Sequence, residues 1–178
     1  RSLGYNSKFT AFFDQGNLLE DLLLHNSIRY RHLPQEDDFL KQLVREKDNY
    51  FNNHSVYVVT HKEDQITILI EKGSFAILHF EDENTSGVFV GKKSGLISRL
   101  VKVKRVVDFK PFNGKFYLNY LTVNSQINWY DSDTNELKFE TELQQLLLIN
   151  AVEPSTKSKI GFGAKMKGYG LQYQDQAY

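Results

Sequence analysis

The most constraining feature of this sequence is a pair of long strand-like runs joined by Asn113-Gly114. Residues 96–112 and 115–123 are both rich in β-branched and aromatic side chains, which favour strands. An Asn-Gly dipeptide tolerates positive φ at both central positions of a tight turn, so it is a strong hairpin signal. We therefore expect two antiparallel strands here and a fold built around antiparallel pairing.

Strand-like alternation already begins near residue 55. The segments SVYVVTH (55–61), QITILIEK (65–72) and FAILHFE (75–81) are separated by short polar turns. This pattern predicts three consecutive antiparallel strands, a meander. In the middle segment, Ile66, Ile68 and Ile70 fall on one face because strand side chains alternate with a period of two.

Polar segments delimit the remaining strands. Residues 81–95 are rich in Asp, Asn, Ser and Gly, which predicts an exposed loop that includes a short edge strand over 88–90. Residues 131–135 form a further polar turn. The last strand is expected over 137–152, and its fully apolar run at 146–149 should be covered on both faces.

Helical signals occur only in the first 50 residues. Asn17 caps a short predicted helix with two pairs of leucines on one side. A second predicted helix follows Pro34, has acidic residues in its first turn, and runs to about Lys47. After Pro154 the composition shifts to Ser, Thr, Lys and Gly without a fixed period.

These signals predict an α+β to mainly β fold. We expect a curved, half-barrel-like antiparallel sheet of six to eight strands, with one or two helices from the N-terminal part packed on it. A single domain is expected over residues 1–153, followed by a loosely ordered tail or linker over 154–178.

Composition narrows the possible partners. The 22 Lys and Arg residues balance 22 Asp and Glu residues, so no long-range field of one sign favours nucleic acid, and none is expected as a partner. No apolar run approaches the roughly 20 residues that span a bilayer, so we expect no transmembrane segment. The absence of cysteine excludes disulfides and thiolate metal sites. Residue 1 is Arg, and we expect any targeting segment to lie outside this sequence.

Motifs for metals, cofactors and nucleophilic catalysis are missing. The five histidines do not form the His-Glu-x-x-His pattern of zinc sites, so we interpret them as surface residues and predict no metal site. Gly161-x-Gly163 lacks the strand and helix of a dinucleotide fold, and no cofactor is predicted. Without a Gly-x-Ser-x-Gly elbow or a cysteine, we predict no catalytic residues and no enzyme activity.

Three further clusters could carry chemistry and have a plainer interpretation. The acidic segments 81–83 and 131–133 could serve glycoside hydrolysis or bind calcium weakly, but acids are typical of turns. The basic residues of 102–105 suit a sheet edge, where charge discourages edge pairing. Strand aromatics could stack a base or a sugar, although they more commonly form cross-strand pairs; they are Phe116, Tyr117, Tyr120, Trp129 and Tyr130.

One segment resembles a known family. SVYVVTHKEDQITILIEKGSFAILHFE (55–81), together with 107–110 and 114–120, is similar to Bacteroidetes envelope proteins that carry an N-terminal carboxypeptidase-regulatory-like domain. Members show a "vYvI" strand, a "G-x-lyId-x-x-sfAI" hairpin and a "v-x-F-k-x-x-x-GKwYL-x-Y" segment, whereas this chain has Gln65 near the position of the hairpin's first glycine. The C-terminal YQDQAY looks like the lead-in to an aromatic segment of that family.

This resemblance implies a periplasmic or outer-membrane location, and it implies no established activity. The expected curved sheet with helices on one side is also similar to periplasmic lipoprotein carriers, which bind acyl chains in a half-open barrel.

Three hypotheses about function follow. In the first, the chain is a non-enzymatic envelope module. Its ligand would be an apolar molecule such as a lipid, or a glycan, or another envelope protein. In the second, it is a scaffold for protein interaction with a filled core. In the third, it is a carboxylate-dependent hydrolase. For the first hypothesis the ligand would face a concave sheet surface lined by Ile66, Ile68, Ile70, Phe116, Leu118 and Tyr120.

Overall fold

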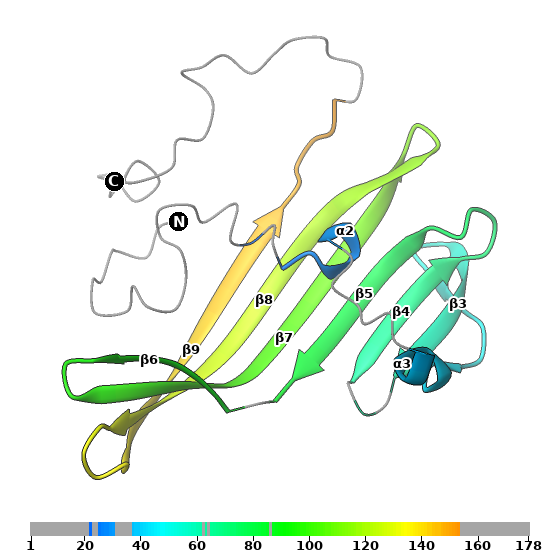
Figure 1. Cartoon of the computed structure of the whole chain (residues 1–178). Helices are drawn as coiled ribbons and strands as arrows, with labels where there is room; N and C mark the ends of the chain where they lie inside the picture. The colour runs from blue at the N-terminus through cyan, green and yellow to red at the C-terminus, as the bar shows by residue number, and fades with distance from the viewer. Residues whose placement is uncertain are drawn as a thin grey trace.

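The computed structural model describes residues 22, 25–30, 37–61, 63, 65–85 and 87–153. Within them the chain forms one open, antiparallel sheet with two short helices on its near face (Figure 1). This agrees with the predicted mainly β fold. The helices are α2 (Ser27–Tyr30) and α3 (Asp37–Lys41). The strands are β1 (Val44–Arg45), β2 (Asn49–Phe51), β3 (His54–His61), β4 (Ile66–Glu71), β5 (Ile77–Asn84), β6 (Val88–Lys93), β7 (Leu96–Phe112), β8 (Lys115–Asp131) and β9 (Leu137–Leu148).

The strand order follows the sequence closely. The path through the sheet is β1-β3-β4-β5-β7-β8-β9, while β2 pairs with β3 and β6 pairs with β7. Strands β5 and β6 lie end to end against β7, because β5 pairs with its residues 103–108 and β6 with its residues 96–100. The sheet is therefore a meander in which β2 and β6 are short insertions. Short connections favour this arrangement, because they place consecutive strands side by side.

The hairpin of β7 and β8 confirms the prediction from Asn113-Gly114. Asn113 has φ of 49° and Gly114 has φ of 72°, so both turn residues lie in the left-handed region. Each strand is 17 residues long. Together they form the longest ribbon of the sheet, which pairs with β5 and β6 on one side and with β9 on the other (Figure 1).

The hydrophobic core lies between the helices and one face of the sheet, which we call the helix face. Leu22 and Phe39 come from the N-terminal part, and they pack on sheet residues that alternate along four strands. The sheet residues of this buried cluster are Ile66, Ile68, Phe80, Val107, Leu121 and Val123. Burial of these side chains is the main stabilising term of the fold.

Helix α3 is shorter than predicted. It ends at Lys41, and Val44 and Arg45 instead pair with Thr60 and Val59 as strand β1. The Glu46 N–H then donates to the Val58 carbonyl at 2.8 Å. Pairing with β3 satisfies the backbone groups that the helix would have used, so tertiary contacts override the local helical pattern.

Two strand predictions also need correction. The predicted loop at 81–95 is wrong in its first part, because β5 continues to Asn84, and the edge strand predicted at 88–90 extends to Lys93 as β6. The last strand ends at Leu148, and Leu146 and Leu148 remain 60% and 57% exposed, so cover on both faces is wrong. Of the predicted helix after Asn17, Leu22 is described and is helical, and the rest lies outside the described residues, as does the tail at 154–178.

Candidate binding surface

The side of the sheet opposite the helices is rich in polar groups, and we call it the polar face. Successive side chains of a strand point to opposite faces, so residues that alternate with the core lie there. In the strand register, Glu83 lies opposite Lys104, Lys104 opposite Asn124, and Asn124 opposite Gln144. Rows of polar side chains therefore cross the sheet from β5 to β9.

The six residues predicted to face a ligand are distributed over both faces. Ile66 and Ile68 are buried in the core cluster, and Ile70 and Leu118 pack against it. The register shifts after Asp108, so that Leu118 lies opposite Phe109 but Tyr120 lies opposite Asp108. This bulge turns Tyr120 to the polar face.

The sixth residue, Phe116, makes an edge contact with His54, with ring centroids 5.7 Å apart. His54 belongs to β3, so this aromatic contact brings the start of β8 against a strand at the other end of the sheet order. The predicted set of six residues thus contributes mainly to packing.

His79 and Asp108 form the most enclosed polar pair of the polar face. The Nδ1 atom of His79 contacts the Asp108 carboxylate, and its Nε2 atom lies 3.7 Å from a Glu81 oxygen. Phe51 packs against the imidazole with ring centroids 5.4 Å apart. A general base keeps one nitrogen directed at the group it deprotonates. Because both nitrogens of His79 face carboxylates, we interpret this cluster as structural.

Tyr120 completes this cluster from β8. Burial of the phenol, together with the hydrogen bond that its hydroxyl donates to Asp108, raises the pKa of Tyr120 to about 12. Both effects favour the neutral phenol, because ionisation would place a second negative charge beside a carboxylate. Tyr120 is therefore a neutral donor across the physiological pH range.

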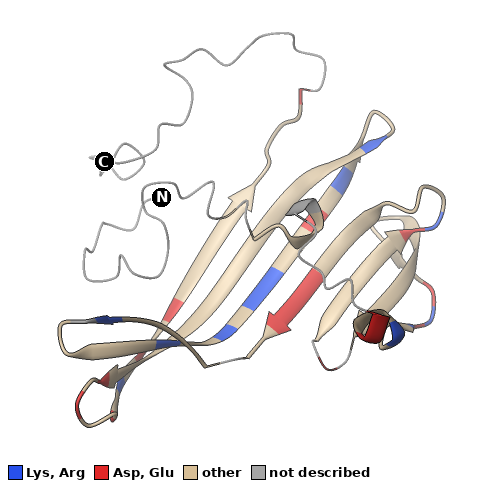
Figure 2. Ribbon diagram, in the orientation of Figure 1, with Lys and Arg blue, Asp and Glu red and all other residues tan. Residues whose placement is uncertain are grey.

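The acidic residues 81–83 lie within β5 and pair with the basic residues of β7 (Figure 2). Lys104 Nζ lies 2.6 Å from Glu81 and Lys102 Nζ lies 2.8 Å from Glu83. Strand β7 has neighbours on both sides, so the prediction that its basic stretch marks a sheet edge is wrong. Pairing across the strands neutralises this stretch, which weakens it as a site for an anionic ligand.

Asp82 points to the helix face, where Arg105 binds it. Arg105 Nε donates to Asp82 Oδ1 at 3.0 Å, and its Nη2 contacts the second oxygen. Burial raises the pKa of Asp82, and the guanidinium of Arg105 offsets part of that rise. The three successive acids thus divide between two faces and do not converge on one substrate.

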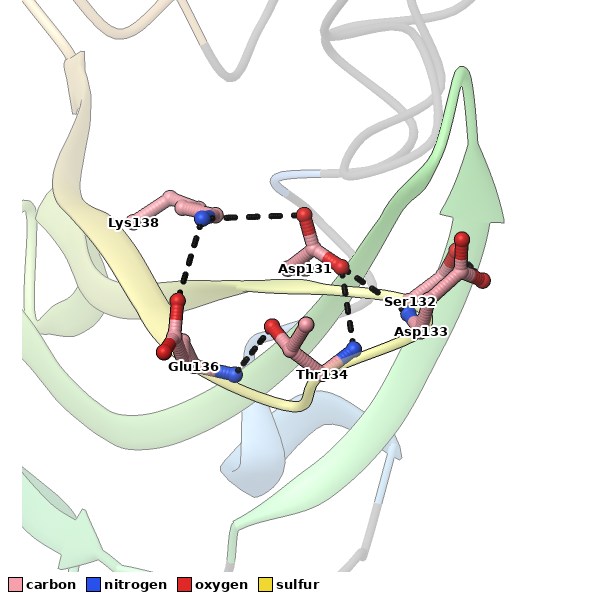
Figure 3. Close-up of polar contacts among 6 residues, drawn as sticks. All are labelled: Asp131, Ser132, Asp133, Thr134, Glu136 and Lys138. Carbon is pink, nitrogen blue, oxygen red and sulfur yellow. Dashed lines mark hydrogen bonds and ion pairs between the residues drawn. The ribbon is translucent and has the colours of Figure 1, made fainter.

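The second acidic segment closes the turn between β8 and β9 (Figure 3). The Asp131 carboxylate accepts hydrogen bonds from the backbone N–H groups of Thr134 and Asp133, each at 3.0 Å. These two bonds lower the pKa of Asp131. Lys138 bridges Asp131 and Glu136, so the carboxylate has a structural role in the turn, as its composition predicts.

Strand β9 has one neighbouring strand within the described part of the chain. The Ile149 N–H donates to the Asn119 carbonyl at 2.9 Å, and the register from Tyr120 to Trp129 is regular. Antiparallel ladders alternate, so odd-numbered residues of β9 bond to β8 and even-numbered residues direct their N–H and C=O groups outward. Within the described residues, the outer edge of β9 thus presents a row of backbone groups that no other strand pairs with.

The side chains of the same even-numbered residues are all exposed. They lie on the polar face and comprise Glu140, Glu142, Gln144, Leu146 and Leu148. Sequence reasoning treated residues 146–149 only as covered core and missed this surface. The signal was present, because two acids and two leucines share one period-two series in β9.

A separate exposed cluster surrounds Tyr57. Phe75 stacks on its ring with centroids 6.3 Å apart, and the Arg45 guanidinium lies 4.5 Å from the ring centroid. Phe75 is 69% exposed and has φ of 58°, which is unfavourable for a bulky residue. This side chain belongs to the turn before β5, although the sequence pattern placed it in the strand.

The histidines of the described residues differ in their exposure. His61 is 2% exposed and stacks on Phe39, so its interpretation as a surface residue is wrong. No group of three or more His, Cys, Asp or Glu side chains in this part of the chain could hold a metal ion. None of its helices has the length and apolar character needed to cross a membrane.

No family model, curated protein or solved structure matches this chain.

Proposed function

We propose that this domain is a non-enzymatic interaction module, and that β9 binds an extended segment of a partner protein by adding it to the sheet. One observation carries this proposal. The even-numbered residues of β9 direct their backbone groups outward, and the side chains of the same residues are exposed. Strand addition uses both, since the backbone supplies affinity and the alternate side chains supply specificity.

The packing of the core favours this function over an apolar-ligand carrier. Ile66 and Ile68, which would have lined a ligand surface, are each 6% exposed and pack among core residues. A carrier needs an apolar cavity of several hundred cubic ångströms. The burial of these two residues instead supports the scaffold hypothesis, in which the surface of the sheet is the functional part.

An envelope location remains part of the proposal. It rests on the resemblance of residues 55–81, 107–110 and 114–120 to Bacteroidetes envelope proteins. In such a location the partner would be another envelope protein.

The test is a selection of binding peptides followed by a single substitution. A library of ten-residue random peptides is selected on the full chain, and binders are then measured against Gln144→Pro and Gln144→Ala. Proline removes the outward N–H of residue 144 without removing a bond to β8, and it is tolerated on edge strands. Alanine keeps the N–H and is the matched control.

We expect most binders to lose affinity for Gln144→Pro and to keep it for Gln144→Ala. Circular dichroism and the fluorescence of Trp129, the only tryptophan, check that both variants fold. Binders that are indifferent to Gln144→Pro would contradict strand addition at β9.

A further inference from the structure

The exposed even-numbered side chains of β9 change from acidic to apolar along the strand, and this order specifies the partner that β9 binds. We propose that β9 receives an antiparallel segment with two Lys or Arg residues, spaced two apart, opposite Glu140 and Glu142, and with apolar residues opposite Leu146 and Leu148. This inference rests on the proposed function and adds the chemistry and the direction of the bound segment.

The first argument is that the two acids lack compensation. Across the register, Glu140 lies opposite Asn128 and Glu142 lies opposite Gln126, both uncharged. No ion pair joins either acid to a basic group within the described part of the chain, whereas Lys138 pairs with the turn residues. Two like charges on one strand edge gain most from a basic neighbour, and a further strand at this edge would supply one directly opposite them.

The second argument is that the molecule already contains the complementary arrangement. On the same face, Glu81 and Glu83 of β5 are two residues apart, and Lys104 and Lys102 of β7 pair with them at 2.6 and 2.8 Å. The β5–β7 pair is antiparallel. These ion pairs are diagonal, because Glu83 lies opposite Lys104 and Glu81 lies opposite Val106. A segment with the Lys-x-Lys spacing of β7 would bring its charges within reach of Glu140 and Glu142, either directly across or diagonally.

The third argument concerns the other end of the strand. Leu146 and Leu148 are more than half exposed, and they follow the acids at the same period. Exposed apolar side chains on an edge strand are an aggregation hazard unless a partner covers them. The opposing residues of the partner are therefore apolar, and the series runs from charged to apolar along one direction.

Direction follows from the sheet itself. Every strand pair in it is antiparallel, and antiparallel pairs are slightly more stable per residue than parallel ones. In an antiparallel partner the apolar residues come first in sequence and the basic residues last.

The experiment uses nine-residue synthetic peptides and the full chain. The probe has Val at positions 1 and 3, Thr at position 5 and Lys at positions 7 and 9, with Ser or Thr elsewhere. One control replaces both lysines by glutamate, and a second has the same residues in reverse order. Affinities are measured by titration for the native chain and for the double variant Glu140→Lys/Glu142→Lys.

We expect the glutamate peptide to bind the native chain about tenfold more weakly than the lysine peptide, as two partly exposed ion pairs allow. The double variant should reverse this preference, and 0.5 M salt should reduce it. The reverse-order peptide should bind more weakly than the probe, and Gln144→Pro should abolish binding of all three.

Different failures have different meanings. Equal affinity for lysine and glutamate peptides, with binding still lost in Gln144→Pro, overturns the partner chemistry and leaves strand addition intact. Preference for the reverse-order peptide overturns the antiparallel direction. A dimer that Gln144→Pro dissociates and that the probe does not displace overturns the inference in favour of a second copy. Binding that is insensitive to Gln144→Pro overturns the proposed function as well.

Discussion

At the scale of single residues, the burial of Tyr120 and its hydrogen bond to Asp108 link the stability of the fold to pH. The folded pKa of Tyr120 is about 12, against an ordinary value of 10.0. Between these values the unfolded chain releases the phenolic proton and the folded chain retains it. The unfolded state then binds fewer protons, so the stability that this group contributes falls as pH rises from 10 towards 12.

We therefore expect Tyr120→Phe to lose part of this alkaline dependence. The measurement is the urea midpoint of unfolding between pH 8 and pH 11.5 for both proteins. Tyr50→Phe, at a residue that is 75% exposed, controls for the loss of a phenol and should retain the native slope. An unchanged slope in Tyr120→Phe would contradict the role of this tyrosine.

Asn124 gives a second prediction at this scale. Its side-chain oxygen is buried and accepts no hydrogen bond within the described residues, and the same holds for Asn128. A buried acceptor without a donor costs about 1–3 kcal/mol, and valine suits a strand better than asparagine. We expect Asn124→Val to raise the free energy of unfolding by about 1 kcal/mol, measured by urea denaturation. A lower stability would mean that the amide makes a favourable contact.

At the scale of elements, local sequence patterns predict where the strands lie. Strand pairing determines which face of the sheet each side chain occupies. The Asn113-Gly114 turn and the isoleucine alternation of β4 can be predicted from the sequence, because each depends on a few neighbouring residues. The bulges of β7 cannot be predicted in this way, because an extra residue in one strand is defined only relative to the partner strand. One bulge sends Tyr120 and Leu118 to opposite faces, which a strict period of two cannot predict.

Strand β9 provides the prediction at this scale. Amide exchange measured residue by residue in the full chain should alternate, with slow exchange at Leu143, Gln145 and Leu147 and fast exchange at Gln144 and Leu146. The physical reason is that only the odd-numbered amides donate to β8.

Slow exchange of the even-numbered amides in a monomeric sample would mean that the chain itself occupies the edge. The proposed binding surface would then be closed. Addition of the lysine peptide, in contrast, should slow exchange at the even-numbered positions alone.

At the scale of the whole molecule, the buried cluster beneath the helices joins residues of β4, β5, β7 and β8. Leu121 is fully buried between core neighbours on β7 and β9, whereas Leu146 on β9 is 60% exposed. We expect Leu121→Ala to lower the free energy of unfolding by about 2–5 kcal/mol, because it leaves a cavity. Leu146→Ala is the matched control and should change it by less than about 0.5 kcal/mol.

Trp129 and far-ultraviolet circular dichroism give two independent probes of that unfolding. Coincident transitions in both proteins are expected if the long ribbon of β7, β8 and β9 unfolds with the core. A Leu146→Ala variant as unstable as Leu121→Ala would contradict the exposure of the polar-face leucines.

The hairpin of β7 and β8 shows what the sequence by itself determined. Turn chemistry and a period of two specified strands, antiparallel pairing and a mainly β fold, because these depend on residues close in sequence. Only the tertiary structure decided which face each strand buries, which charges pair, and that β9 lies at the edge. Those outcomes depend on which strands become neighbours, so the acids of β5 are neutralised by β7 while the acids of β9 remain exposed.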